Sequence, residues 1–174
     1  MTEKIQIDPS DKLWPACLKI YLEAFPIDER RESTELEMIN ASTGYSFYAL
    51  VNSSTLCGIL EIWEFSNFIF IEHLAIIPSM QNKGLGRSAL SGYLNDNGKP
   101  VILEAEVPHD DISTKRIDFY NSLGFRIIDV DYTQPPYYPG KKSVPMVLLS
   151  NKPLHLNSIL NSIQMIRHFV YKMP

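Results

Sequence analysis

The chain has few of the features that mark specialised classes of protein. Its only two cysteines, Cys17 and Cys57, lie in apolar surroundings, so we interpret them as core residues and not as a disulfide. No apolar run approaches the ~20 residues that a membrane span needs, and no signal peptide is recognisable. No basic run occurs and the net charge is −4, which argues against nucleic acid as a partner. We therefore expect a cytoplasmic protein that binds neither membranes nor nucleic acid.

What is present is an ordinary globular composition. Apolar residues make up 45% and charged residues 21% of the 174 positions. A chain of this length forms one domain and buries roughly 70% of its unfolded surface. We expect residues 1–150 to form the domain and residues 151–174 to add a helix packed on it, because isoleucines recur there at helical spacing. A dimer contact or a lid is the alternative role for this helix, and the chain is expected to be a monomer or homodimer.

Hydrophobic periodicity predicts the order of the helices and strands. Tight turns link the first three long strands into an antiparallel meander, and the next strand returns parallel to the third through a right-handed crossover. The expected class is therefore α/β (α+β), with a mixed, mostly antiparallel sheet flanked by helices. Helices are expected at 13–25, 33–40, 86–97 and 113–123, and strands at 45–51, 56–65, 68–77, 101–107, 125–132 and 144–149.

The most informative stretch is a strand followed by a glycine-containing loop. The apolar strand ends at Pro78, and the loop Gln81-Asn82-Lys83-Gly84-Leu85-Gly86-Arg87 opens a helix. Glycines let the backbone turn tightly and approach a ligand, and the free N–H groups of the first helical turn point at it. The partial positive charge of the helix N-terminus favours phosphate. The loop therefore predicts a site for a ligand that carries a diphosphate.

Two cofactor classes fit such a loop. The residues from Gly84 to Ala89 match the dinucleotide fingerprint, with Glu104 about 20 residues further on. Against that interpretation, six residues separate the strand from the first glycine, and the preceding strands are antiparallel hairpins instead of β-α-β units. A P-loop is excluded because no Gly-Lys-Ser/Thr closes the loop.

A longer pattern resembles the GNAT superfamily of N-acetyltransferases. Its first part is Ile76-Ile77-Pro78 followed by Gln81-Asn82-Lys83-Gly84-Leu85-Gly86, and its second part is the helix Ser113 to Leu123 with Tyr120 and a terminal Leu-Gly-Phe. The likeness covers about residues 45–150. It implies a GNAT-like, seven-stranded type of sheet, with acetyl-CoA as the acyl donor.

The resemblance also implies which residues hold this donor. The backbone N–H of Leu74 would polarise the thioester carbonyl, Ala75 and Ile76 would line the pantetheine, and the loop would grip the diphosphate. Ser113 stands where many members carry an asparagine that contacts the cofactor. The expected cofactor-binding residues are Leu74, Ala75, Ile76, Gln81, Asn82, Lys83, Gly84, Leu85, Gly86, Arg87, Ser88 and Ser113.

Three residues are candidates for proton transfer. Glu72 is an acid inside an apolar strand, where burial raises a carboxyl pKa, and alternation gives it the same face as Leu74; an ion-paired carboxylate is the alternative. Glu106 is the second candidate base, since it resembles a glutamate used by some protein N-terminal acetyltransferases of the superfamily. By the same resemblance Tyr120 protonates the departing thiolate, with a core aromatic as the alternative.

The expected activity is acetyl transfer from acetyl-CoA to a primary amine by direct attack, since no cysteine lies at the chemistry and no metal site is expected. The acceptor is a small molecule or peptide, and clustered acidic residues favour a cationic amine. A non-catalytic acyl-CoA-binding sensor and an NAD(P)-binding oxidoreductase are the alternatives.

Overall fold

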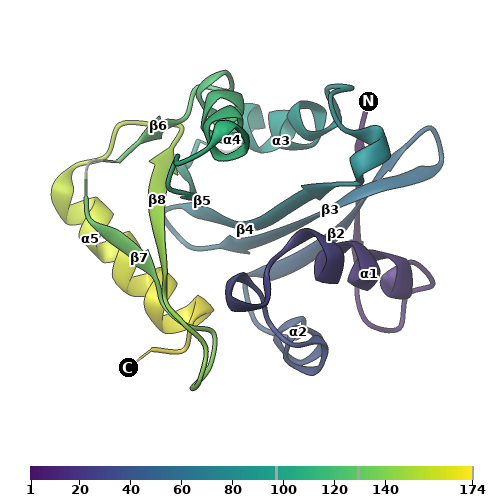
Figure 1. Cartoon of the computed structure of the whole chain (residues 1–174), viewed down its shortest axis with the longest axis horizontal. Coiled ribbons are helices and arrows are strands. Elements are labelled where there is room, and N and C mark those ends of the chain that lie inside the picture. Colours follow the sequence, from purple (N-terminus) through teal and green to yellow (C-terminus); the bar gives the residue numbers. More distant parts are fainter. Residues whose placement is uncertain (97, 129, 174) are drawn as a thin grey trace.

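A mostly antiparallel sheet runs through the whole molecule (Figure 1). The computed structural model describes residues 1–96, 98–128 and 130–173. The strand order is β1-β2-β3-β4-β5-β8-β6, and β7 also pairs with β8. The strands are β1 (Glu3–Ile7), β2 (Tyr45–Asn52), β3 (Thr55–Glu64), β4 (Ile69–Ile76), β5 (Val101–Glu106), β6 (Arg126–Ile127), β7 (Tyr132–Gln134) and β8 (Val144–Ser150). The helices are α1 (Trp14–Ala24), α2 (Ser33–Ile39), α3 (Leu85–Asp96), α4 (Asp111–Asn121) and α5 (Leu156–Met165), which continues as a π-helix over Ile166–Val170.

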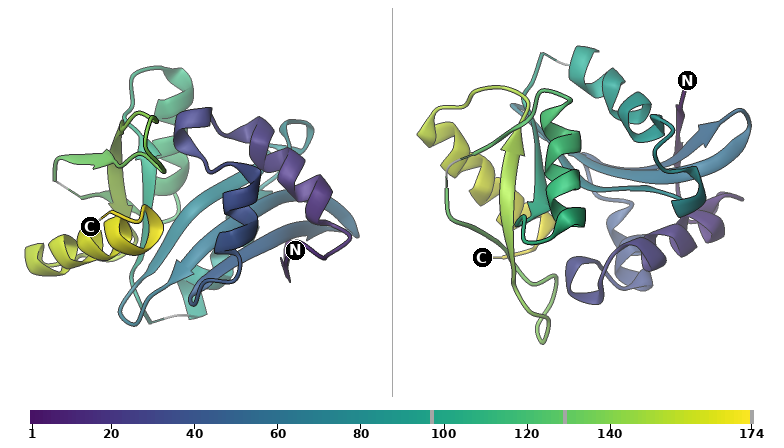
Figure 2. Two further views of the ribbon diagram at one scale, coloured as in Figure 1. Left: turned by 90° about the horizontal axis from the view of Figure 1, so that it is seen from below. Right: turned by 45° about the horizontal axis from the view of Figure 1, so that its top comes forward.

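Helices cover both faces of the sheet (Figures 1 and 2). On one face α3 and α4 bury Leu90 and Ile117 against the sheet, and on the other face α1 and α2 bury Tyr21 and Leu36. The C-terminal helix α5 packs Ile163 into the same core as α1 and α2. Burial of these apolar side chains is the main driving force for the layered arrangement.

The sheet opens between its only parallel pair of neighbouring strands in the described part of the chain. Strands β4 and β5 are paired only from Ile69 to Ile71, opposite Val101 to Leu103. Beyond this point they diverge, and β5 instead pairs along Ile102–Glu106 with β8, which runs across the direction of β4 in Figure 1. The second half of β4 therefore has a free edge that faces the opening.

A β-bulge lies in β4 next to this opening. Glu61 of β3 pairs with His73, but the next residue, Ile62, pairs with Ile71, so Glu72 is an extra residue without a partner on β3. A bulge interrupts the alternation of side chains. As a result Glu72 bonds to Trp63 in the core under α1 and α2, whereas Leu74 packs against the core on the opposite face. The expectation that Glu72 shares a face with Leu74 is wrong for this reason.

The structure confirms the fold class and corrects several elements. The sheet has eight strands in the described residues against the six expected from the sequence, because β1 adds an edge strand that the sequence pattern did not reveal and one expected strand is divided in two. The expected strand 125–132 is split into β6 and β7: the N–H of Val130 donates to the carbonyl of Ile128 at 2.9 Å and so leaves the ladder. The expected end of the helix 86–97, Asn97, lies outside the described residues.

The structure also bears on the two cysteines and on the lack of long apolar runs. Cys17 and Cys57 are both free and buried, which confirms their interpretation as core residues. Among the residues described, none of the helices combines the length and the apolar character that crossing a bilayer requires.

Candidate active site

A cavity of about 970 Å³ occupies the opening between β4 and β5. It extends from the N-terminus of α3, along the free edge of β4, to the C-terminal end of α1 on the opposite side. Most of the site residues expected from the sequence line it. Those that do are Glu72, Leu74, Ala75, Ile76, Gln81, Asn82, Gly84, Leu85, Gly86, Arg87, Glu106 and Tyr120, whereas Lys83, Ser88 and Ser113 do not.

The loop before α3 forms an open cradle of backbone amides. Asn82 and Gly84 have φ angles of +61° and +73°, which turn the chain into the helix. The helical ladder begins where the N–H of Ser88 donates to the carbonyl of Gly84 at 2.9 Å. The N–H groups of Leu85, Gly86 and Arg87 come before that bond and have no acceptor among the described residues. Free first-turn amides bind anions, so the cradle fits a phosphate group.

Glycine at position 86 keeps this cradle close to the neighbouring helix. A Cβ atom there would lie 3.4 Å from the ring of Phe119 on α4 and 3.7 Å from Ile76. The missing side chain lets a ligand approach the backbone where α3 and α4 come together.

Polar side chains of the loop fix its shape. The Gln81 amide donates to the carbonyl of Ile76 at 2.9 Å, on the free edge of β4. Arg87 reaches across to α4 and donates to the Ser122 hydroxyl at 2.7 Å. The Lys83 ammonium bonds to a carbonyl within the loop. Gln81 and Arg87 therefore connect the cradle to β4 and to α4.

Two of the expected cofactor contacts have other roles. The Ser88 hydroxyl accepts a hydrogen bond from the N–H of Thr2 at 2.8 Å, which joins the N-terminus to α3. Ser113 is fully buried and forms the capping box of α4 with Asp110, donating to its carboxylate at 2.6 Å. Both hydroxyls are satisfied within the protein and neither lines the cavity, so the structure argues against their contact with a ligand.

The free edge of β4 presents its backbone to the cavity. The N–H of Ile77 donates to the carbonyl of Cys57 on β3 at 2.9 Å. Because backbone groups alternate in direction along a strand, the N–H and C=O groups of Leu74 and Ile76 point the other way, into the opening. This arrangement provides a strand edge that is not paired with another strand, and apart from the Ile76 carbonyl, which accepts from Gln81, its groups are available for hydrogen bonds with an extended ligand.

Glu72 is the centre of a buried polar cluster. Its side chain is only 1% exposed and accepts hydrogen bonds from Arg31, from Trp63 Nε1 at 2.6 Å and from Tyr137 Oη at 2.8 Å. Burial would raise the pKa of Glu72, but the adjacent Arg31 guanidinium, His73 and the hydrogen bond from Trp63 together outweigh burial and hold the pKa below its ordinary value. A carboxylate so stabilised is a weak base, and this argues against the base role that the sequence suggested. Glu72 has instead the environment of an ion-paired carboxylate, which was the alternative interpretation.

His73 forms a second buried cluster on the same core. Its Nε2 lies 2.9 Å from the carbonyl of Glu29, and its Nδ1 lies 3.3 Å from the carboxylate of Glu61, which also accepts from Tyr45. Burial alone would lower the pKa of His73, but the Glu61 carboxylate raises it above the ordinary value. A histidine held on both nitrogens has a structural role.

Tyr120 reaches the cavity from α4. It is 8% exposed, and its ring packs edge to face on Phe125 at 5.8 Å. Its hydroxyl makes no hydrogen bond with the part of the chain that the structure describes. Burial raises the pKa of Tyr120 to about 12, so the phenol keeps its proton at neutral pH. The side chain is both a core aromatic and a group that can donate a proton into the cavity.

A carboxylate that sequence reasoning did not assign to catalysis lies at the base of the cavity. Glu104 of β5 accepts hydrogen bonds from Tyr132 Oη and, at 2.8 Å, from Tyr171 Oη. Burial raises the pKa of Glu104 to about 7. Glu106, two residues on, pairs with Arg116 at 3.1 Å and is more exposed. An acid inside an apolar strand was the signal used for Glu72, and the same signal applies to Glu104.

The sequence model of the Acetyltransferase (GNAT) family matches residues 14–125, from α1 past the end of α4. The matched part contains the free edge of β4, the amide cradle and Tyr120. The chain belongs to the Acetyltransferase (GNAT) family.

Individual GNAT relatives agree with this assignment. A Bacillus subtilis (strain 168) protein named "Putative acetyltransferase YjbC" is 31% identical over 106 residues, which span 60% of this chain and about half (53%) of that relative. A solved GNAT-family structure from Bacteroides thetaiotaomicron superimposes with a TM-score of 0.90 at 27% identity, covering 99% of each chain. A GNAT structure from Elizabethkingia anophelis with acetyl-CoA bound has a TM-score of 0.58 at 17% identity, covering 86% of this chain and 96% of that one.

The GNAT topology also argues against the interpretation of the glycine loop as a dinucleotide-binding motif. Dinucleotide-binding sheets are built from successive parallel β-α-β units. Within the described residues only β4 and β5 pair in parallel, and they do so over three residues of each strand. The match of Gly84 to Ala89 with the dinucleotide fingerprint is therefore a coincidence of spacing.

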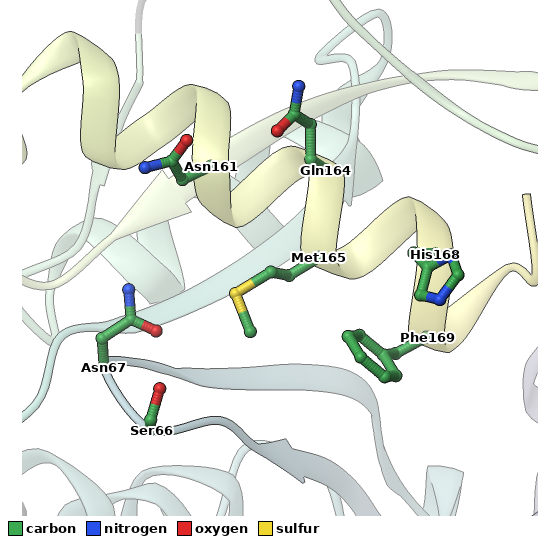
Figure 3. A pocket seen from close by; sticks show the side chains of 7 residues that line it. All are labelled: Ser66, Asn67, Asn161, Gln164, Met165, His168 and Phe169. Atoms are coloured by element: carbon green, nitrogen blue, oxygen red, sulfur yellow. The ribbon is translucent and has the colours of Figure 1, made fainter. Parts of the chain in front are cut away.

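A second, shallower pocket of about 610 Å³ lies away from this GNAT site, between the C-terminal helix and the turn after β3 (Figure 3). Met165 and Phe169 point toward the turn that carries Ser66 and Asn67. None of the expected site residues lines this pocket. Its lining is Ser66, Asn67, Asn161, Gln164, Met165, His168 and Phe169.

Proposed function

We propose that this chain is an N-acetyltransferase that moves the acetyl group of acetyl-CoA to a primary amine by direct transfer. The observation that carries the proposal is the convergence of three features on one cavity. The free first-turn amides of α3, the unpaired edge of β4, and the pair of Tyr120 and Glu104 all line it. Membership of the GNAT family, and acetyl-CoA bound to a relative of the same fold, support acetyl-CoA as the donor.

Binding of the donor would use backbone groups more than side chains. The amides of Leu85, Gly86 and Arg87 would hold the diphosphate, and the edge from Leu74 to Ile76 would pair with the pantetheine arm. The Leu74 N–H would donate to the thioester carbonyl oxygen and stabilise the negative charge that develops there. Because this amide is fixed by the strand, it needs no rearrangement during the reaction.

Proton transfer would use one base and one acid. Glu104, with a pKa of about 7 raised by burial, would take a proton from the ammonium form of the acceptor, directly or through water. The free amine then attacks the carbonyl carbon, a C–N bond forms and the C–S bond breaks. Tyr120 would give its proton to the departing sulfur, and the second proton that the nitrogen loses on becoming an amide would restore the Tyr120 phenol, directly or through water. We prefer Glu104 to Glu72, which is ion-paired with Arg31, and to Glu106, which pairs with Arg116.

The charge at the α1 end of the cavity favours a cationic acceptor. Glu23 and Glu29 lie at this end, and Glu104 lines the same cavity. Burial, followed by the nearby Glu106, raises the pKa of Glu29. Carboxylates in a partly closed cleft attract positively charged substrates. We therefore propose an amine with at least one further positive charge, on a small molecule or a peptide.

The first test is titration calorimetry of the purified chain with acetyl-CoA, with NAD as the control. We expect a heat of binding with acetyl-CoA and none with NAD. Binding of NAD without binding of acetyl-CoA would identify a nucleotide-dependent oxidoreductase. A screen of spermidine, lysine amide and a neutral amine, followed by release of free thiol, would then test turnover. Binding without turnover of any amine would indicate an acyl-CoA sensor, and reaction with neutral amines alone would reject the cationic acceptor.

Activity of two variants tests the proton-transfer residues. Glu104→Gln and Tyr120→Phe are each expected to lower turnover by roughly 10²-fold or more while acetyl-CoA binding is retained. Glu106→Gln is the matched control for the base, because it removes a carboxylate from the same face of β5. If Glu106→Gln abolished turnover and Glu104→Gln did not, the base would be Glu106.

A further inference from the structure

The C-terminal segment packs behind residues of the GNAT site and does not itself line the cavity. Arg31 donates to the carbonyl of Val170 at 2.7 Å, in a buried position. The next residue, Tyr171, is 3% exposed and its ring lies 4.9 Å from that of Tyr137. Phe169 packs at 5.9 Å on Phe65, beside the second pocket (Figure 3). These contacts fix Tyr171 in one position relative to β5.

Tyr171 contacts the carboxylate proposed above as the base. Its hydroxyl donates to Glu104 Oε2 at 2.8 Å, while Tyr132 donates to Oε1 from the other side. Each carboxylate oxygen therefore has one phenol donor. Both tyrosines lie after residue 125, where the match to the family ends. The part of the chain common to the family supplies the carboxylate, and the C-terminal third of this chain supplies its donors.

We propose that Tyr171 is a positioning residue of the acetyl transfer, which together with Tyr132 fixes the orientation of the Glu104 carboxylate toward the acceptor. The proposal rests on the proposed function, because it assumes that Glu104 accepts the substrate proton. Two donors on opposite oxygens prevent the carboxylate from rotating. They also stabilise its charged form in a buried place, where the charge alone would be costly.

Several ionisable groups surround Glu104. Besides the two phenols, Glu72 and His73 act on it from β4, and Tyr137 approaches from the loop before β8. Arg167 acts on Tyr132 from the C-terminal segment. Burial raises the pKa of Glu104, the two phenol hydrogen bonds lower it, Glu72 raises it and His73 lowers it. Removing the Tyr171 hydroxyl removes one lowering contribution, so the pKa of Glu104 should rise.

The test is a ¹³C NMR titration of the glutamate side-chain carboxyl groups in the full chain. Glu104→Gln assigns the Glu104 signal by its loss. In Tyr171→Phe, which keeps the ring, the midpoint of the Glu104 titration should move up by about one pH unit, in line with loss of a hydrogen bond to a charged group. Tyr138→Phe is the matched control, because Tyr138 donates to a carboxylate, Glu32, at 2.7 Å at the surface; it should leave the Glu104 midpoint unchanged. An unchanged or lower midpoint in Tyr171→Phe would overturn the proposal.

Kinetics separate a positioning role from a structural one. The ratio of kcat/KM between Tyr171→Phe and the wild type, measured with spermidine across pH, cancels the ionisation of the amine. The pKa shift should make this ratio about fivefold lower near pH 7 than near pH 9, for a one-unit shift from a pKa of about 7, and a deficit that remains at pH 9 measures the lost orientation of the carboxylate. A ratio that is the same at every pH would show that Tyr171 does not act through Glu104 and would reject the proposal. If no amine is acetylated, the proposed function fails, while the shifted NMR midpoint would still show that Tyr171 controls Glu104.

Discussion

The buried ion pair of Arg31 and Glu72 offers a sharp test of what holds the segment before α2 against β4 and the C-terminal segment. The perturbation is Arg31→Met, which keeps the length and apolar part of the side chain and removes its charge. Arg31 is 3% exposed and also donates to the Val170 carbonyl, so it connects the segment before α2, β4 and the C-terminal segment.

The magnitude follows from what remains after the change. Glu72 would keep its donors Trp63 and Tyr137 but would be a buried charge without its guanidinium partner. Removing one partner of a buried pair costs about 3–5 kcal/mol of unfolding free energy. For a domain of this size such a loss lowers Tm by roughly 6–20 °C. Adding Glu72→Gln should restore part of the loss, because a neutral amide still offers an acceptor oxygen to Trp63 and Tyr137.

Urea unfolding measures these free energies, and pH gives a second check. Arg31, His73 and the hydrogen bond from Trp63 together outweigh burial and hold the pKa of Glu72 below its ordinary value of 4.5. The charged Glu72 therefore contributes stability above that pH, and this stability is lost as pH falls through the folded pKa. The gap between wild type and Arg31→Met should therefore be constant from pH 6 to 8 and narrow below pH ~4.5. Lys99→Met removes the partly exposed pair with Glu64 and should cost at most about 1 kcal/mol. Equal costs for Arg31→Met and Lys99→Met would refute the reasoning.

Three further predictions concern the glycines and Tyr120. Gly84→Ala should weaken acetyl-CoA binding in calorimetry, whereas Gly140→Ala should not. Both glycines have a positive φ and open space at Cβ, so each variant should lose about 1–2 kcal/mol of unfolding free energy. Equal acetyl-CoA affinities of the two variants would contradict the role of the cradle. Gly58→Ala would place a Cβ 2.1 Å from the Ala75 carbonyl oxygen, so a loss of about 1–3 kcal/mol or more is expected in urea unfolding, and wild-type stability would speak against so close an approach of β3 to β4. Tyr120→Phe should keep its Tm within a few degrees while losing turnover, and full turnover would remove Tyr120 as the acid.

Local patterns predicted the elements that carry the cradle. The strand before Pro78, the loop with Gly84, and the helix that follows all lie where periodicity and glycine spacing put them. The helix that ends before Gly124 was also expected, although it begins two residues earlier, at Asp111, with Asp110 as its cap. These features depend on residues close together in the chain, so sequence alone determines them.

Short or interrupted strands were harder to predict. Strand β1 has only one buried residue, Ile7, so its alternation is weak and the pairing with β2 decides it. The division between β6 and β7 depends on how each pairs with β8. In both places the partner strand, and not the local sequence, fixes the structure.

The sequence by itself determined the fold family, the amide cradle and the position of Tyr120, because short-range backbone preferences and apolar periodicity specify them. Only the tertiary structure decided the chemistry of the glutamates. Glu72 is the extra residue of a β-bulge, and the bulge directs its side chain toward Arg31, 41 positions away in the chain. Tyr171 donates to Glu104 across 67 positions. A carboxyl pKa depends on the charges, donors and burial within a few ångströms in space, and those neighbours are chosen by packing and not by chain order.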